Sequence, residues 1–358
     1  MSLKRWISDE TEFIDIEGPV VLESGHSLPQ VRVAYRTWGH PRPNATLVCH
    51  ALTGSADADD WWADLFGPGK ALDPDRDYIV CANVIGGCYG TTGPTSRAVG
   101  AFEPYGGTFP EVTIRDIVHV QAKLLDRLGV DTLDLVVGGS MGGMQVLEWA
   151  ALYPDRVDAI APIATGPTQS AWGVALSEAQ RQAIRADANY AGGRYQLGAG
   201  PAQGLAAARS MAMISYRSPY NFVERFGRDQ ADDDTYEVQS YLRHQGEKLV
   251  NRFDANTYLT LIGAMDSHDV GRGRGSVEAA LRSMDQPALV ISVSSDGLYP
   301  ATEVAEMAHH LPNAELHEIE APHGHDAFLI RVAEVNDYLV DFIERHSAKS
   351  RLRRVVNN

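Results

Sequence analysis

The sequence is poor in cysteine, which limits how the fold can be held together. It has 3 cysteines, Cys49, Cys81 and Cys88, and no pair has the Cys-x-x-Cys spacing. An odd count without such a pair argues against both a disulfide scaffold and a zinc site. With 358 residues, of which 44% are hydrophobic, the chain is instead large enough to rely on a buried core.

Positive charge is also scarce. There are 31 Lys and Arg residues against 47 Asp and Glu, and the formal net charge is -16. Because a surface of this sign repels nucleic acid and anionic membranes, we expect neither as a partner. The arginines between glycines in 271–275 could suggest a nucleic-acid tract, but the acidity of the chain favours a connection between two parts of the fold.

Long hydrophobic runs are missing as well. No segment reaches the roughly 18 apolar residues of a membrane span, and Met1–Ile7 lacks the apolar stretch of a secretory signal. We therefore expect a cytoplasmic protein. The glycine-rich loop 86–94 contains neither of the two common nucleotide-binding glycine motifs. Its length indicates a functional loop, the alternative being a rigid surface loop.

Strand and helix patterns alternate along the chain, which is typical of an α/β fold with a mostly parallel sheet. Strands are expected at 13–16, 31–38, 45–50, 77–84, 135–137, 159–164, 287–294 and 314–319. From about Gly166 to Met284 helical patterns replace the strands, at 177–188, 203–215, 235–250 and 255–264. We predict a core of residues 1–165 and 286–358, with a helical lid insertion at 166–285.

One stretch carries the strongest indication of chemistry. Gly138-x-Ser140-x-Gly142 follows an apolar strand and precedes a helical pattern. This is the spacing of a nucleophile elbow, in which a strained serine sits at the apex of a strand-to-helix turn. An inert serine in a glycine-rich turn would have the same letters, but the flanking patterns favour the elbow and therefore an α/β-hydrolase fold.

A nucleophilic serine needs a base to take its proton and a carboxylate to orient that base. In the elbow fold the acid and then the histidine follow the serine along the chain. Ser140, Asp296 and His325 have this order, and the last two each follow a predicted strand. His323 is an alternative base. His323 and His325 could also suggest a metal site, but no further ligand lies at suitable spacing, so we expect no metal.

The oxyanion of an acyl-transfer intermediate needs two N–H donors. The elbow fold takes one from the residue after the nucleophile and one from a loop after an early strand. We therefore expect the backbone N–H groups of Met141 and of Leu52, in the loop His50–Gly54, to form the oxyanion hole. An ordinary strand-to-loop turn is the alternative for this loop.

Several motifs along nearly the whole chain resemble the homoserine O-acetyltransferase family, a group of acyltransferases with the α/β-hydrolase fold. Together they are far more specific than the elbow alone. They are His50–Gly54, Gly67–Lys70, Asn83–Gly90, Gly138–Gln145, Arg225–Arg228, Arg252–Asn256, His268–Gly275 and Gly324–Phe328.

The resemblance also implies roles for individual residues. It favours His325 over His323 as the base, because the family base stands in a Gly-His-Asp motif. It implies that Arg209 holds the carboxylate of an amino-acid substrate, that Asp326 receives its ammonium, and that Tyr216 lines the same pocket. The loop 55–60 departs from the family pattern, which often has a histidine there.

The implied activity is transfer of acetyl from acetyl-CoA to L-homoserine through an acyl-enzyme on Ser140, in methionine biosynthesis. Acetyl-CoA would be a co-substrate, with no permanently bound cofactor, and the resemblance implies a homodimer joined through the lid helices. Three alternatives remain: a succinyl donor or serine acceptor in the same fold, an esterase, and a binding protein on an inactive hydrolase fold.

Overall fold

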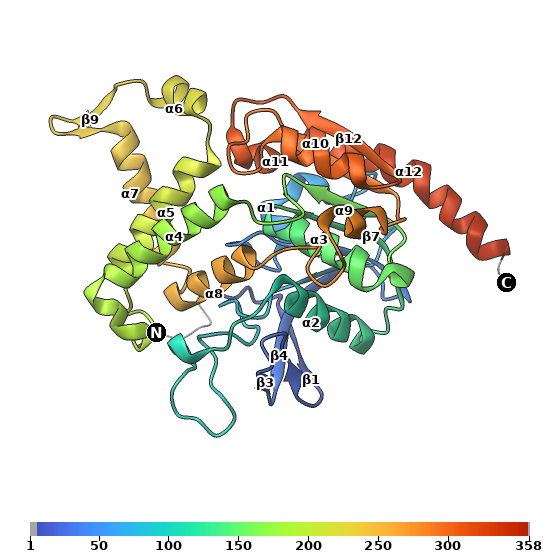
Figure 1. The fold of residues 1–358 in the computed structure, drawn as a ribbon, viewed down its shortest axis with the longest axis horizontal. Coiled ribbons are helices and arrows are strands. Elements are labelled where there is room, and N and C mark those ends of the chain that lie inside the picture. The colour runs from blue at the N-terminus through green and yellow to red at the C-terminus, as the bar shows by residue number, and fades with distance from the viewer. Residues whose placement is uncertain (1–5, 357–358) are drawn as a thin grey trace.

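The computed structural model describes residues 6–356, and its centre is an 8-stranded sheet (Figure 1). The strand order is β1-β4-β6-β5-β7-β8-β11-β12. The bounds are β1 Glu12–Ile16, β4 Val31–Trp38, β5 Asn44–Cys49, β6 Ile79–Ala82, β7 Thr132–Gly139, β8 Ile160–Ile163, β11 Ala288–Val293 and β12 Ala314–Ile319. Neighbours from β6 to β12 pair in parallel, whereas β4 is antiparallel to both β1 and β6. The predicted mostly parallel sheet is confirmed.

Helices cover both faces of this sheet and close two hydrophobic cores. Adjacent residues of a strand point to opposite faces, so Val136 packs in one core and Val137 in the other. The helices α2 (Ile114–Arg127), α3 (Met141–Leu152) and α10 (Ala301–His310) contribute to the first core. The helices α1 (Ala58–Trp61) and α12 (Val332–Val356) contribute to the second. Burial on both faces explains why the central strands are apolar almost throughout.

The chain between β8 and β11 leaves the sheet and forms further helices, of which α4 to α8 lie together on one side of the molecule whereas α9 lies beside the core and contacts α10 (Figure 1). They are α4 Ala171–Ala186, α5 Ala202–Tyr216, α6 Pro219–Phe226, α7 Glu237–Val250, α8 Ala255–Asp266 and α9 Val277–Arg282. The helix α5 packs between α4 and α7. Gly204 and Gly246 permit this, since a Cβ on either would lie within 3 Å of the neighbouring helix.

One detail of this insertion differs from the sequence interpretation, and another agrees with it. A short hairpin of β9 (Gln230–Asp232) and β10 (Thr235–Tyr236) interrupts the helices, and α7 begins only after it. The hairpin is exposed and carries no alternating apolar pattern that would predict it. The arginines of 271–275 are used within the protein, since Arg272 pairs with Glu23 and Arg274 with Glu148.

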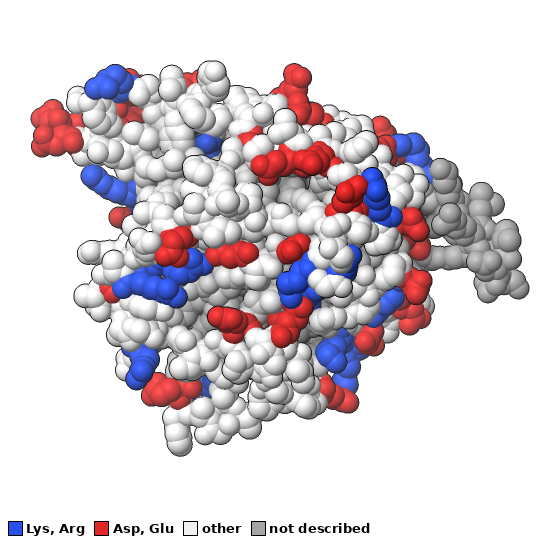
Figure 2. Space-filling model, viewed as in Figure 1, with Lys and Arg blue, Asp and Glu red and all other residues white. Residues whose placement is uncertain are grey.

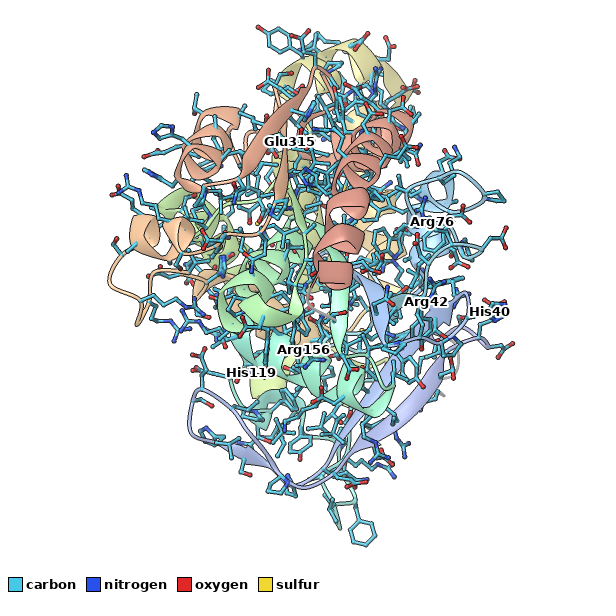
Figure 3. The ribbon with its side chains drawn as sticks, turned by 90° about the vertical axis from the view of Figure 1, so that its right-hand side faces the viewer. His40, Arg42, Arg76, His119, Arg156 and Glu315 are labelled. Carbon is cyan, nitrogen blue, oxygen red and sulfur yellow. The ribbon has the colours of Figure 1, made fainter. Side chains whose placement is uncertain are left out.

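Charged side chains of both signs are distributed over the surface. Figure 2 shows Lys and Arg interspersed with Asp and Glu, with no basic stripe on the face in view. At the β12 edge of the sheet, Glu315 accepts from Arg345 of α12 at 2.7 Å (Figure 3). None of the helices in the described residues is long and apolar enough to cross a membrane.

Candidate active site

Ser140 occupies the sharp turn between β7 and α3. Its backbone has φ 57° and ψ -125°, a conformation that costs energy for any residue with a side chain. The turn is held by bonds from the Ser140 N–H to the Ile163 carbonyl and from the Thr165 hydroxyl to the Ser140 carbonyl, each 2.9 Å. The predicted elbow geometry is therefore present.

The glycines on either side of Ser140 are required by a backbone neighbour. A Cβ on Gly138 would lie 2.6 Å from the carbonyl oxygen of Cys49, and a Cβ on Gly142 would overlap the same oxygen. The end of β5 therefore crosses directly against the elbow. This contact brings the loop that follows Cys49 next to the first turn of α3.

Asp296 and His325 lie at the same edge of the sheet, because each follows the carboxyl end of a parallel strand. The Nδ1 atom of His325 is 2.7 Å from Oδ2 of Asp296. The other carboxylate oxygen of Asp296 accepts from the N–H groups of Leu298, at 2.7 Å, and Tyr299, at 3.0 Å. A carboxylate in this position fixes the proton on Nδ1 and leaves Nε2 free to accept one.

The pair is almost entirely buried, with side-chain exposures of 4% for His325 and 0% for Asp296. Burial alone lowers the pKa of His325, but the charge and hydrogen bond of Asp296 outweigh it, and the net pKa is raised above 6.5. The imidazole is therefore a stronger base than an ordinary histidine, which suits removal of a hydroxyl proton.

Aromatic rings pack the loop that carries His325 against the elbow. The ring of Phe328 lies where a side chain on Gly139 would be, and its centroid is 5.6 Å from that of His325. Tyr216 and Tyr299 lie on other sides of the imidazole, at 5.6 Å and 5.4 Å. Within the described residues Ser140 Oγ has no hydrogen-bond partner, as is common for catalytic groups before substrate binds.

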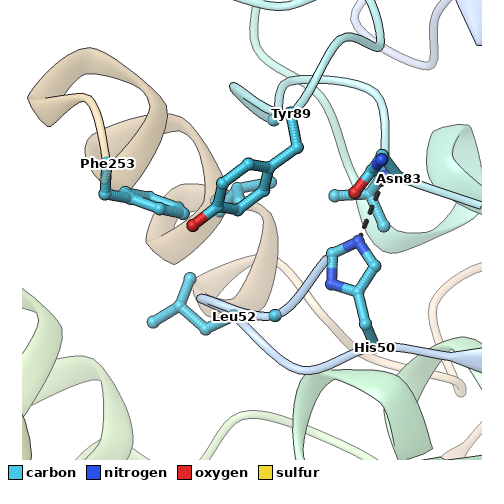
Figure 4. Close-up of a pocket in the computed structure, with 9 residues that line it drawn as sticks. His50, Leu52, Asn83, Tyr89 and Phe253 are labelled. Carbon is cyan, nitrogen blue, oxygen red and sulfur yellow. Dashed lines mark hydrogen bonds between the residues drawn. The ribbon is translucent and has the colours of Figure 1, made fainter. Parts of the chain in front are cut away.

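The loop with Leu52 is fixed by His50. The amide of Val84 donates to Nε2 of His50 at 3.2 Å (Figure 4), so Nδ1 carries the proton and donates to the Ala51 carbonyl at 2.8 Å. Burial lowers the pKa of His50 to about 4, which keeps the ring neutral. The Ala51 carbonyl and the Leu52 N–H belong to one trans peptide and point in opposite directions. By holding the carbonyl, His50 sets the direction of the Leu52 N–H.

The three residues assigned to an amino-acid substrate lie together beside His325. The guanidinium carbon of Arg209, on α5, lies 5.5 Å from the ring centroid of Tyr216. One terminal nitrogen of Arg209 is buried without a hydrogen-bond partner in the described residues. A buried unpaired donor is costly, so this site favours an anionic ligand.

Asp326 has a partner that sequence reasoning missed. Its Oδ2 atom is 3.1 Å from Nε of Arg217. Burial raises the pKa of Asp326, and the charges of Arg217, His325 and Arg209 offset this only in part. Arg217 directly follows Tyr216 at the end of α5, where a basic residue is usually solvated, so the sequence carried no indication of this pairing.

Two loops near the site that the sequence analysis singled out are held tightly by the fold. The loop 86–94 is almost wholly buried, so the alternative of a surface loop is wrong. It coils back on itself, with the Gly86 N–H donating to the Thr92 carbonyl at 2.9 Å. In the loop 55–60, Asp57 and Asp59 both accept from Arg36 of β4. Their carboxylates therefore anchor the loop to the sheet.

A family model described as the alpha/beta hydrolase fold matches residues 45–332. Homoserine O-acetyltransferase of Nostoc punctiforme is 54% identical to this chain, over 95% of this chain and 98% of its own. The protein of the same name from Chlorobaculum tepidum is 53% identical over 96% and 97%. The chain belongs to the homoserine O-acetyltransferase family. The predicted resemblance is confirmed, and this is a family of acyltransferases.

The homoserine O-acetyltransferase family shares its fold with hydrolases. The solved structure of esterase E22 has a TM-score of 0.86 and 27% identity to this chain, covering 93% of this chain and 99% of the esterase. The fold of the core therefore does not separate transfer to an alcohol from transfer to water. That distinction depends on the groups around the elbow.

The elbow contact predicts the effect of a single methyl group. Replacing Gly142 by Ala should destabilise the protein by about 1–3 kcal/mol, because the new Cβ overlaps the Cys49 carbonyl. Gly263→Ala in α8 is the matched control, since a Cβ there meets nothing within 4 Å, and it should stabilise the helix by up to about 1 kcal/mol. Thermal unfolding measures both. An unchanged melting temperature for Gly142→Ala would contradict the contact.

The His325–Asp296 pair predicts a pH profile. Only the neutral imidazole accepts a proton, so acylation should fall as pH drops through the raised pKa, with a midpoint above 6.5. Asp296→Asn removes the charge that opposes burial, so the midpoint should move to lower pH while the rate falls by about 10³–10⁴. The pH dependence of p-nitrophenyl acetate cleavage measures both. A midpoint that stays in place would show that Asp296 does not control the base.

Proposed function

We propose that the protein transfers an acetyl group from acetyl-CoA to the hydroxyl of L-homoserine in two steps. The Nε2 atom of His325 takes the Ser140 proton, and Oγ attacks the thioester carbonyl. The C–S bond then breaks, and CoA leaves with the proton from His325. The homoserine hydroxyl next gives its proton to Nε2 and attacks the acyl-enzyme, which releases O-acetyl-L-homoserine and frees Ser140.

The N–H groups of Leu52 and Met141 are the proposed donors to the oxyanion in both steps. Neither has an acceptor within the described part of the chain, so both are free to bind a ligand. Met141 is the first residue of α3, where N–H groups are unpaired and the helix dipole favours negative charge. Two such donors contribute about 3 kcal/mol each in comparable sites.

The observation that carries the choice of acceptor is the unpaired buried nitrogen of Arg209. A substrate carboxylate would satisfy it through the planar guanidinium fork. The carboxylate of Asp326, whose Oδ2 pairs with Arg217, would accept the substrate ammonium. These opposite charges, both near Tyr216 and His325, match an amino acid whose side-chain hydroxyl reaches the base.

An esterase is the second candidate, because esterase E22 has the same fold. A simple ester offers neither a carboxylate for Arg209 nor an ammonium for Asp326, so two charged groups would be buried there without a ligand. The names of the relatives further support homoserine as the acceptor and acetyl as the acyl group. We propose that this reaction belongs to methionine biosynthesis.

We also propose a cytoplasmic homodimer joined through the insertion. The exposed apolar side chains Ile214, Tyr220 and Val223 lie on its helices α5 and α6, with exposures of 54%, 80% and 71%. Covering them with a second copy would remove this surface from water.

Arg209 provides the test that separates the transferase from the esterase. Arg209→Met should raise the KM for homoserine by about 10- to 100-fold, the loss of a charge-assisted pair, and leave acylation by p-nitrophenyl acetate nearly unchanged. Acyl transfer is followed as thiol release from acetyl-CoA or succinyl-CoA, with homoserine or serine. Ser140→Ala is the inactive control. Release that needs no acceptor in the wild type would favour the esterase, and an unchanged KM would remove Arg209 from the acceptor site.

A further inference from the structure

Arg252 connects three segments that are distant in sequence. It lies in the insertion, between α7 and α8, and its terminal nitrogen Nη1 donates to the Thr53 carbonyl at 2.8 Å and to the Tyr89 hydroxyl at 2.5 Å. Thr53 adjoins Leu52, and Tyr89 belongs to the buried loop 86–94. Leu52, Tyr89 and Phe253 line one small apolar pocket (Figure 4).

The loop of Leu52 is thereby held at two of its carbonyls. The Ala51 carbonyl accepts from His50 at 2.8 Å and from the Gly54 N–H at 2.9 Å. Arg252 holds the Thr53 carbonyl, two residues further along the loop. The peptide that carries the Leu52 N–H is thus fixed at its own carbonyl by the core, and the chain after it is fixed at Thr53 by the insertion.

The charge of Arg252 has no counterion in the structure. No carboxylate within 4.0 Å forms a salt bridge with it in the described residues, and its acceptors there are a carbonyl and a hydroxyl. Arg36 and Arg217, by contrast, pair with Asp or Glu. A cation without a counterion beside the loop favours the negative charge that develops on the oxyanion.

We propose that Arg252 is a positioning residue that sets the oxyanion hole from the insertion. The inference rests on the proposed role of the Leu52 N–H. Without Arg252 the loop keeps its bond to His50 but loses its anchor at Thr53, so the chain after Leu52 can move and the direction of the Leu52 N–H is fixed less tightly. The rate of acylation should fall. The affinity for homoserine should stay the same, because other groups bind it.

The test compares Arg252→Met with Arg252→Lys and with Arg185→Met, an exposed arginine of α4 that serves as control. Acylation of Ser140 is measured as the burst with p-nitrophenyl acetate, homoserine binding by titration and folding by thermal unfolding. Arg252→Met should acylate about 10- to 100-fold more slowly, less than the loss of a whole oxyanion donor. Its homoserine affinity should stay within about twofold, below the effect of losing one hydrogen bond. The acylation rate of Arg252→Lys should lie between those of Arg252→Met and the wild type, and the rate of Arg185→Met should match the wild type.

Wild-type acylation in Arg252→Met would overturn the proposal, as would an equal loss of homoserine affinity. If Arg252→Met does not fold, Arg252→Lys decides, since it keeps a charge and a donor: a slower burst with unchanged homoserine affinity supports the proposal, and a wild-type burst overturns it. The proposed function is tested separately by the mass of the wild type after exposure to acetyl-CoA. Absence of an acetyl adduct there would count against the acetyl-CoA reaction while leaving the burst comparison valid.

Discussion

The site depends on one backbone contact, the close crossing of the elbow over the carbonyl of Cys49. Because Gly138 and Gly142 lack side chains, the turn that carries Ser140 lies directly against the end of β5. The amide of Gln145 reinforces the crossing by donating to the carbonyls of His50 and Met141, at 3.1 Å each. The two proposed oxyanion donors follow from it, since Met141 begins the helix on one side and Leu52 lies three residues beyond Cys49 on the other. The spacing of nucleophile and donors is therefore fixed by backbone geometry, before any side chain of the insertion contributes.

Buried charges join the rest of the molecule to this centre. Glu148 of the elbow helix is only 1% exposed and accepts from Arg115 of α2 and Arg274 of the segment 268–275. A buried carboxylate without partners would be expensive, but two guanidiniums satisfy it. The segment 268–275, which leads from the insertion back to the core, is thus bound to α3, the helix that follows Ser140. Contacts from the middle of the insertion also bind it to the loop that carries His325, since Ser218 donates to the Pro322 carbonyl and Arg217 pairs with Asp326.

Local patterns of the sequence predicted most of the core. The strands at 31–38 and 314–319 have their predicted bounds, because burial on a sheet face imposes a period that a single segment displays. The elbow was predictable for a related reason, since the turn has room only for glycine at fixed positions around the serine. Arg217, Tyr299 and Arg252 were missed because each acts on a partner brought close only by the fold. The hairpin β9–β10 was missed because its residues are exposed and polar.

The division between core and insertion bears on the chemistry that this fold performs. The groups of the core, Ser140, Asp296 and His325 with the two backbone donors, are those that any acyl transfer needs, including hydrolysis. Arg209, Tyr216, Arg217 and Arg252 all come from the insertion. Under the proposed function, the insertion therefore supplies the group that binds the acceptor's carboxylate and one anchor of the oxyanion loop, whereas Asp326 of the core receives the ammonium. If Arg252 of the insertion must contact the Leu52 loop for efficient acylation, the acyl-enzyme forms when Arg209, in the same insertion, is already in place for the acceptor. Water then competes with a hydroxyl that is held next to the base, and transfer is favoured over hydrolysis by position.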